Sequence, residues 1–206
     1  MKITKNTMQE SLDKALEIFS KNVIKPNCSV IIKYINDEDF IASAKDTQFN
    51  SMLINSKFYE DFDKEYKSFA AVYPMDKTQI IKLMGLPYRI SISLDRAKRV
   101  LSKESTKNTK EYLLHVFFHE LTHLFEDEIK DKYSECYDII SNKYNSENHI
   151  NEMLAETFSY KYTDHVRCDE MEKRLNYKLY KRLNNQRINI VHHDDEKEMT
   201  EYMKYI

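Results

Sequence analysis

The chain contains one glycine, Gly85, among 206 residues. Glycine takes positive φ angles more readily than any other residue, so tight turns of that kind and glycine-terminated helices must be rare here. Asparagine is the next most tolerant residue at positive φ. The scarcity of glycine therefore favours a mostly helical protein whose connections are rich in asparagine.

The composition excludes several classes of protein. Hydrophobic residues make up 41% of the chain and the formal net charge is −2, which is typical of a globular protein rather than a disordered one. The chain lacks the excess of basic residues that would indicate a nucleic-acid partner. No apolar run approaches 18 residues, so we expect no membrane span. The three widely spaced cysteines do not predict a disulfide framework.

The first 20 residues lack the apolar run and cleavage site of a signal peptide. On that basis we expect a cytoplasmic protein. Secretion stays the alternative if a leader has been removed from this sequence.

Hydrophobic periodicity predicts both helices and strands. The run at 28–35 and the strictly alternating run at 88–94 predict strands, the second half-buried, and the polar stretch 36–39 between elements predicts a turn. Residues 40–56 are ambiguous, with a short second strand as one interpretation. Apolar residues at helical spacing, together with the motifs below, predict helices at 7–20, 57–72, 77–84, 95–103, 148–163 and 167–187.

A zinc-binding motif, HExxH, spans residues 119–123. Two histidines four positions apart lie one turn apart on the same face of a helix, so His119 and His123 can both reach one metal ion. Neutral imidazole is a good zinc ligand. Glu120 lies beside the metal position, where a carboxylate can accept a proton from a zinc-bound water and act as the general base.

The flanking residues fit an amphipathic helix around this motif. Asn108 and Glu111 form a pattern typical of a helix N-terminus, with Asn108 as the expected cap. The apolar residues fall opposite the two histidines on a helical wheel, so the helix can bury its back while its front faces a cleft. These residues are Leu113, Leu114, Phe117, Phe118, Leu121, Leu124 and Phe125.

A catalytic zinc site needs a third protein ligand. The metzincin pattern would require histidine where Ile129 stands and glycine where Glu126 stands, so that class is excluded. A later helix offers Glu152 and Glu156 on one face with the small residue Ala155, which permits close helix packing. We predict Glu152 as the third ligand.

Three further carboxylates are candidates for orienting a ligand histidine through its second ring nitrogen. Glu156, one turn after Glu152, is the main one. Asp127, four residues after His123, also falls on the face of the site. Glu126 is a weaker candidate.

The segments HELTHLFED and NEMLAETFSYKYTDH together resemble the catalytic domains of the anthrax toxin lethal factor and Pro-Pro endopeptidase family. That family pairs an HExxH helix and trailing acidic residues with a later ExxAExF glutamate helix. The resemblance covers about residues 112–167, and this chain has Leu121 and Thr122 where the family often has Phe-Gly. It implies a gluzincin: a zincin-like α+β domain, predominantly helical, with a small twisted sheet packed on the HExxH helix and the glutamate helix following.

The resemblance also implies one Zn²⁺ per chain held by His119, His123 and Glu152. A tyrosine before the glutamate helix helps to stabilise the transition state in that family. Its position corresponds here to Asn145, so the neighbouring Tyr144 is the candidate and Tyr137 the fallback. ImmA/IrrE-type peptidases, which cleave repressors inside cells, are the alternative family because their ligand spacing is similar.

We therefore expect a single domain over 1–206 that hydrolyses a protein or peptide substrate. It would comprise N-terminal helices and the small sheet (1–104), the two ligand helices (105–187) and a polar C-terminal segment (188–206). The strand at 89–94 is a candidate for pairing with the substrate backbone through a free edge. A non-catalytic binding module is the rival from another class. The sequence predicts no nucleic-acid or membrane partner and leaves the oligomeric state open.

Overall fold

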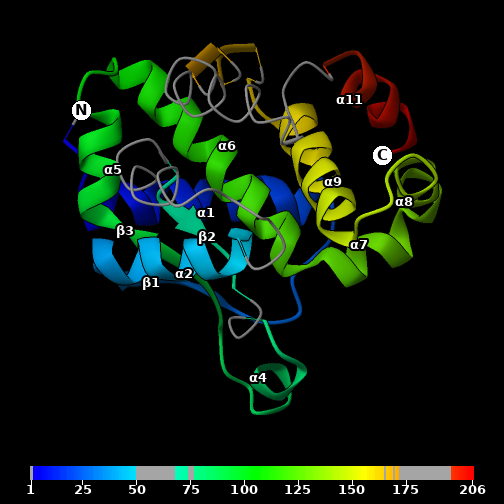
Figure 1. The fold of residues 1–206 in the computed structure, drawn as a ribbon, viewed down its shortest axis with the longest axis horizontal. Coiled ribbons are helices and arrows are strands. Elements are labelled where there is room, and N and C mark those ends of the chain that lie inside the picture. Colours follow the sequence, from blue (N-terminus) through cyan, green and yellow to red (C-terminus); the bar gives the residue numbers. More distant parts are fainter. Residues whose placement is uncertain (1, 50–67, 74–76, 165, 169, 172–195) are drawn as a thin grey trace.

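The computed structural model describes residues 2–49, 68–73, 77–164, 166–168, 170–171 and 196–206. In that part of the chain the fold is α+β and predominantly helical, as the sequence predicts (Figure 1). None of the described helices is both long and apolar enough to cross a membrane. In chain order the elements are α1 (Lys5–Asn22), β1 (Val30–Ile35), α2 (Asp37–Phe49), β2 (Ala70–Ala71), α4 (Gln79–Leu83), β3 (Tyr88–Ser93), α5 (Leu94–Leu101), α6 (Thr106–Leu124), α7 (Glu126–Lys132), α8 (Ser134–Ser141), α9 (Glu147–Tyr162), α11 (Glu196–Tyr202) and the 3₁₀ turn η3 (Met203–Tyr205).

The described strands form one three-stranded sheet in the order β1-β3-β2. β1 runs parallel to β3, and the short strand β2 pairs antiparallel with it on the other side. The alternation in β3 predicts a half-buried strand, but Ser91 and Ser93 are as fully buried as Ile90 and Ile92. The prediction is wrong because both faces of this central strand are covered. β3 is the central strand, paired with β1 over its whole length and with β2 at Ser91 and Ile92, so the expected edge pairing with substrate is blocked along β1 and at these two residues.

Helix α1 packs behind α6. Thr4 caps the start of α1 by accepting a hydrogen bond from the amide of Thr7 at 3.2 Å. Its buried stripe, Met8, Leu12, Ala15 and Phe19, has the helical spacing that the sequence predicts. The ring of Phe19 meets the edge of Phe118 from α6, with centroids 5.3 Å apart.

Helices α6 and α9 lie side by side (Figure 1). Ala155 is fully buried between the apolar residues of α9, which fits its expected role in close helix packing. The apolar back of α6 is buried as the wheel predicts, with no more than 4% exposure at Leu113, Leu114, Phe117, Phe118, Leu121, Leu124 and Phe125. The faces that carry the histidines and glutamates are thereby held toward each other.

Two helix starts differ from the sequence predictions. Residues 37–49 form α2, so the predicted turn at 36–39 is wrong and 40–49 hold no strand, whereas the rest of the ambiguous stretch, 50–56, lies outside the described residues. Asn36 accepts a hydrogen bond from the amide of Asp39 at 2.7 Å, and three acidic residues occupy the first turn, where the helix dipole favours them. Helix α6 begins earlier than predicted: Ser105 is the cap, and Asn108 donates its amide to the Ser105 hydroxyl at 3.2 Å.

Some predictions fall on residues outside the described part. The predicted helix at 57–72 lies mostly within 50–67, and its last residues form strand β2 instead. The predicted helix at 167–187 lies mostly within 172–195. The sequence did not predict α7 and α8, which connect the two ligand helices, or α11 in the polar C-terminal segment.

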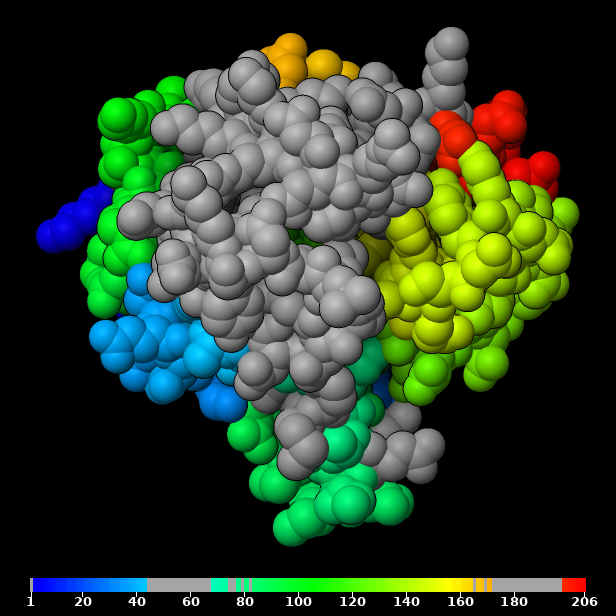
Figure 2. Space-filling model, viewed as in Figure 1, coloured from blue at the N-terminus to red at the C-terminus, as the bar shows by residue number. Residues whose placement is uncertain are grey.

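The segment around α4 projects from the lower edge of the molecule (Figures 1 and 2). Gly85 follows α4 with a φ of 66°, and the amide of Leu86 donates to the carbonyl of Ile81 at 3.0 Å. This is the Schellman ending of a helix, in which the residue after the cap needs a positive φ. Ile80 and Leu83 are 67% and 84% exposed, so this projection shows apolar side chains to solvent.

Candidate metal centre

The two histidines of the HExxH motif face the same point, as their spacing on α6 predicts. Their Nε2 atoms lie 3.0 Å apart, and each side chain is 15% exposed. The backbone of the second histidine is also fixed, since Lys77 donates to the carbonyl of His123 at 2.8 Å and pairs with Glu126 at 2.7 Å. Glu126, the weaker candidate for orienting an imidazole, is thus occupied by a lysine.

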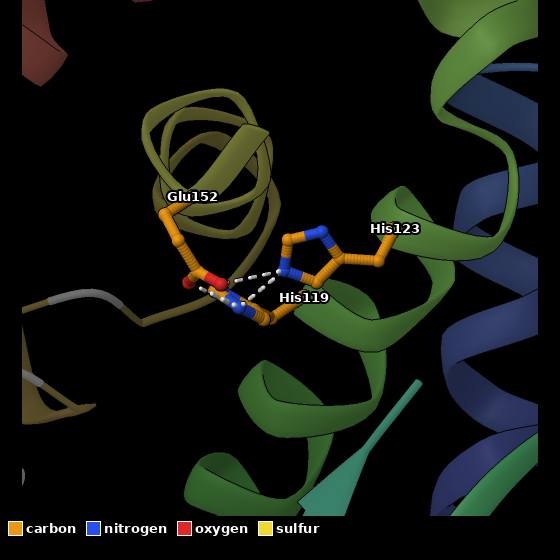
Figure 3. A group of neighbouring side chains, drawn as sticks. All are labelled: His119, His123 and Glu152. Carbon is orange, nitrogen blue, oxygen red and sulfur yellow. Dashed lines mark hydrogen bonds and ion pairs between the residues drawn. The ribbon is translucent and has the colours of Figure 1, made fainter. Parts of the chain in front are cut away.

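Glu152 reaches the same point from α9 (Figure 3). Its carboxylate oxygens lie 3.3 Å from His119 Nε2 and 3.4 Å from His123 Nε2. The side chain is 46% exposed, so the group remains accessible from solvent. The structure therefore brings together all three residues that the sequence predicts as metal ligands.

The separations within this group fit a zinc ion. Zinc bonds to nitrogen and oxygen of about 2.0–2.1 Å in a tetrahedron place neighbouring ligand atoms about 3.3 Å apart. The two imidazole nitrogens lie 3.0 Å apart, and each contacts a different oxygen of Glu152, at 3.3 and 3.4 Å, while a set of one ligand atom from each residue lies within 4.8 Å. The donor set of two imidazoles and one carboxylate suits zinc.

Glu120 is buried next to the two histidines, with 8% of its surface exposed. Burial raises the pKa of Glu120, against the opposing influence of His119 and His123. The backbone amide of Val72, at the end of β2, donates to this carboxylate. A buried carboxylate with a raised pKa beside a metal position is what a general base requires.

Glu156 orients His119 from the side away from the candidate metal position. Its Oε1 atom lies 3.2 Å from His119 Nδ1. A hydrogen on Nδ1 that points to Glu156 leaves the Nε2 lone pair of His119 for a metal. This position is the one that the sequence predicts for Glu156.

The charges of these residues alter one another's pKa values. Burial by itself lowers the pKa of His119, but Glu156 and Glu152 outweigh burial and raise it well above its usual value. Burial likewise tends to raise the pKa of each glutamate, yet the neighbouring histidines hold both below their usual range. In the metal-free protein, a protonated His119 and the two carboxylates of α9 thus stabilise one another's charged forms.

Two predicted residues are not brought into this group. Asp127 is exposed on α7 and makes no hydrogen bond or ion pair to another described residue. The hydroxyl of Tyr144 donates to Glu198 of α11 at 2.9 Å, and its ring stacks on His149. The fallback, Tyr137, receives the ammonium of Lys130 over its ring. The residue that stabilises the oxyanion thus stays a prediction.

His115 has no specific role among the predictions made from the sequence. In the structure its Nε2 lies 3.4 Å from Glu156 and its Nδ1 lies 2.9 Å from the hydroxyl of Thr163. The available signal was its spacing, since His115 precedes His119 by one helical turn. The partner Thr163 lies 48 positions away, and only the packing of α9 on α6 reveals it.

Comparisons with family models, curated proteins and solved structures found no match to this chain, so the resemblance to the lethal factor and Pro-Pro endopeptidase family remains a prediction from its motifs.

Proposed function

We propose that this protein is a zinc-dependent endopeptidase that hydrolyses peptide bonds in a protein substrate. One observation carries the proposal: two imidazole nitrogens and a carboxylate oxygen converge at zinc-ligand separations beside a second, buried carboxylate. His119, His123 and Glu152 would hold one zinc ion per chain, and Glu120 would act as the general base. The resemblance in the two ligand helices supports the same assignment.

The residues have distinct parts in this mechanism. A zinc ion held by such a set acts as a Lewis acid and lowers the pKa of a water molecule to about 7. Glu120 takes the proton of the attacking water and delivers it to the nitrogen of the leaving amine. The backbone amide of Val72 keeps the carboxylate of Glu120 in place. Glu156 holds the His119 ring in the required tautomer.

The substrate backbone would lie along β2 rather than along β3. Within the described residues β2 is the outer strand of the sheet, and the amide that follows it already contacts Glu120. An extended peptide beside β2 would thus bring its backbone close to the general base. No side-chain preference is assigned to the substrate.

The substitution Glu120→Gln tests this function. The amide keeps the shape of the side chain but cannot accept the proton, so cleavage of a diverse peptide library should fall about a thousandfold while zinc stays bound. Zinc would be measured as equivalents per chain by elemental analysis, and cleavage by mass spectrometry of the library. Glu135→Gln makes the same chemical change on the exposed face of α8 and should leave both values unchanged.

Two outcomes would overturn the proposal. Wild-type protein that binds no stoichiometric zinc would remove its foundation. Wild-type protein that binds one zinc but cleaves no member of the library would identify a non-catalytic binding module instead.

A further inference from the structure

His115 is a buried polar residue with a polar partner at each ring nitrogen. Its side chain is 7% exposed, and its ring meets the ring of Tyr160 edge-on at 6.0 Å between centroids. Nδ1 lies 2.9 Å from the Thr163 hydroxyl and Nε2 lies 3.4 Å from Glu156 Oε2. Packing and polar contacts thus hold this imidazole in one orientation.

The direction of the first hydrogen bond follows from the threonine. The hydroxyl of Thr163 has a single hydrogen, and it donates that hydrogen to the carbonyl of Ser159 at 2.6 Å. Toward His115 the same oxygen can therefore only accept, so Nδ1 of His115 carries the donated hydrogen. The other nitrogen, Nε2, is then the atom that faces Glu156.

Glu156 lies between two histidines of the same helix. Its Oε1 atom contacts His119 Nδ1 at 3.2 Å, and its Oε2 atom faces His115 Nε2 at 3.4 Å. Oε2 is buried and has no hydrogen-bond partner among the described residues, and the His115 ring is the group within ion-pair distance of it. Since Nδ1 already carries a hydrogen, Nε2 attracts this oxygen when it carries one as well, as in the imidazolium form, in which both ring nitrogens donate. In that form His115 holds the outer oxygen of Glu156, while the inner oxygen contacts the imidazole of His119.

We propose that His115 is a positioning residue of the metal centre, acting through Glu156 on His119. Thr163 orients His115, His115 holds Glu156, and Glu156 holds the imidazole of His119 with its Nε2 toward the metal position. Without His115, the glutamate can turn away from His119, and the ring loses its fixed tautomer and angle. This role rests on the zinc site of the proposed function, and it adds a residue that lies one helical turn before His119.

Two substitutions at this position separate positioning from packing. His115→Phe keeps the ring volume and removes both polar contacts. His115→Gln keeps an N–H donor that can reach Glu156. Zinc affinity would be measured by competition with a chromophoric chelator, which needs no substrate and no catalysis. Loss of the glutamate contact should weaken affinity about tenfold or more in His115→Phe, while His115→Gln should stay within about threefold of wild type.

A double-mutant cycle with Glu156→Gln tests the route through the glutamate. If His115 acts through Glu156, His115→Phe should have little further effect on zinc affinity once the carboxylate is gone. The d–d absorption of the Co²⁺-loaded protein gives a second readout, because it reports ligand geometry directly and should change in His115→Phe but not in His115→Gln. Thermal unfolding of each metal-free variant checks that it folds.

The results distinguish this inference from the proposed function. Equal zinc affinity in wild type and His115→Phe would overturn the positioning role and leave the proposed function intact. The positioning role would also be overturned if His115→Phe and His115→Gln weakened zinc affinity equally. The same holds if the effects of His115→Phe and Glu156→Gln on zinc affinity were fully additive. The expected affinities in a protein that cleaves no peptide would support positioning and refute the peptidase.

Discussion

Two clusters of charged side chains join elements that are distant in sequence, and they differ in how their charges balance. Asp37 of α2 accepts from Arg96 at 2.7 Å and from Arg99 at 2.5 Å. Two guanidinium groups thus meet one carboxylate, and donors face acceptors. In the candidate metal centre, His119, His123 and Glu152 instead direct two imidazole nitrogens and a carboxylate toward one point, and all of these can bind a cation once the imidazoles are neutral. In the Asp37 cluster, two arginine side chains of the protein neutralise the carboxylate. In the candidate metal centre, the three side chains are of the kinds that bind a metal ion.

The difference suggests that the two clusters stabilise the fold under different conditions. At neutral pH the Asp37 cluster ties α2 to α5 with or without metal. The candidate metal centre should hold α6 against α9 most strongly when zinc is bound. Substitutions in each cluster can therefore be compared with and without metal.

The largest effect is expected for zinc itself. Zinc at about a thousand times its Kd should stabilise the wild-type protein by about 4 kcal/mol, which raises the melting temperature of a chain of this size by about 8–16 °C. His123→Ala removes one ligand and should abolish that rise. The measurement is thermal unfolding with zinc and with a chelator.

His149→Ala serves as the matched histidine substitution, because His149 stacks on Tyr144 and is not one of the three candidate ligands. It should keep the zinc-dependent rise. A wild-type protein that melts at the same temperature in zinc and in chelator would remove the contrast between the two clusters.

An intermediate effect is expected for Asp37→Asn. Arg96 is only 3% exposed, so loss of the carboxylate leaves a buried charge without this partner. Because Asp37 itself is 31% exposed, the free energy of unfolding should fall by about 1–3 kcal/mol rather than by the full value for a buried pair. Urea unfolding should give the same loss in zinc and in chelator.

Asp95→Asn is the control on the neighbouring helix, where the ion pair of Asp95 with Lys98 is exposed. It should change the free energy of unfolding by less than about 1 kcal/mol. A loss for Asp37→Asn that depends on zinc would show that the two clusters are coupled and would contradict their separation.

The smallest effect is the pH dependence of the Asp37 contribution. Burial tends to raise the pKa of Asp37, but hydrogen bonds from Arg96 and Arg99 outweigh it and lower the pKa. A carboxyl whose pKa is lowered by folding stabilises the folded state above its unfolded pKa of about 3.9, and this contribution disappears as the pH falls through the folded value. The difference between wild type and Asp37→Asn in chelator should stay constant from pH 7 to 5.

Below about pH 4 that difference should shrink. Urea unfolding at a series of pH values measures it directly. A difference that grows on acidification would mean that the Arg96 and Arg99 bonds do not set the protonation of Asp37.

The candidate ligand residues could be brought together from sequence because their convergence depends on local geometry and on a motif. Helical spacing alone places His119 and His123 together, and the carboxylate face of α9 supplies Glu152. The start of α2 was missed because Asn36 and the acids after it are common both in turns and in helix N-termini, and sequence does not separate the two. The role of His115 was missed for another reason: its partners come from a different helix, and only the packing brings them near.

Strand β3 illustrates a further limit of the sequence. Alternation of apolar and polar residues predicts one buried face, yet Ser91 and Ser93 are buried as well. The hydroxyl of Ser93 has partners inside the protein, since it accepts from the amide of Arg96 and donates to Asp37. Small polar residues of this kind can be buried when such partners exist. Their identity depends on elements that pack from elsewhere.

The single glycine also has a consequence for the unfolded chain. Gly85 adopts the positive φ that ends α4, and none of the other 205 residues is glycine. Glycine gives an unfolded chain more conformations than alanine does, a difference of about 0.4–1 kcal/mol per residue in the free energy of folding. A chain almost without glycine therefore loses less entropy when it folds. Part of the stability of this protein therefore comes from the low conformational entropy of its unfolded chain and not from any contact in the native structure.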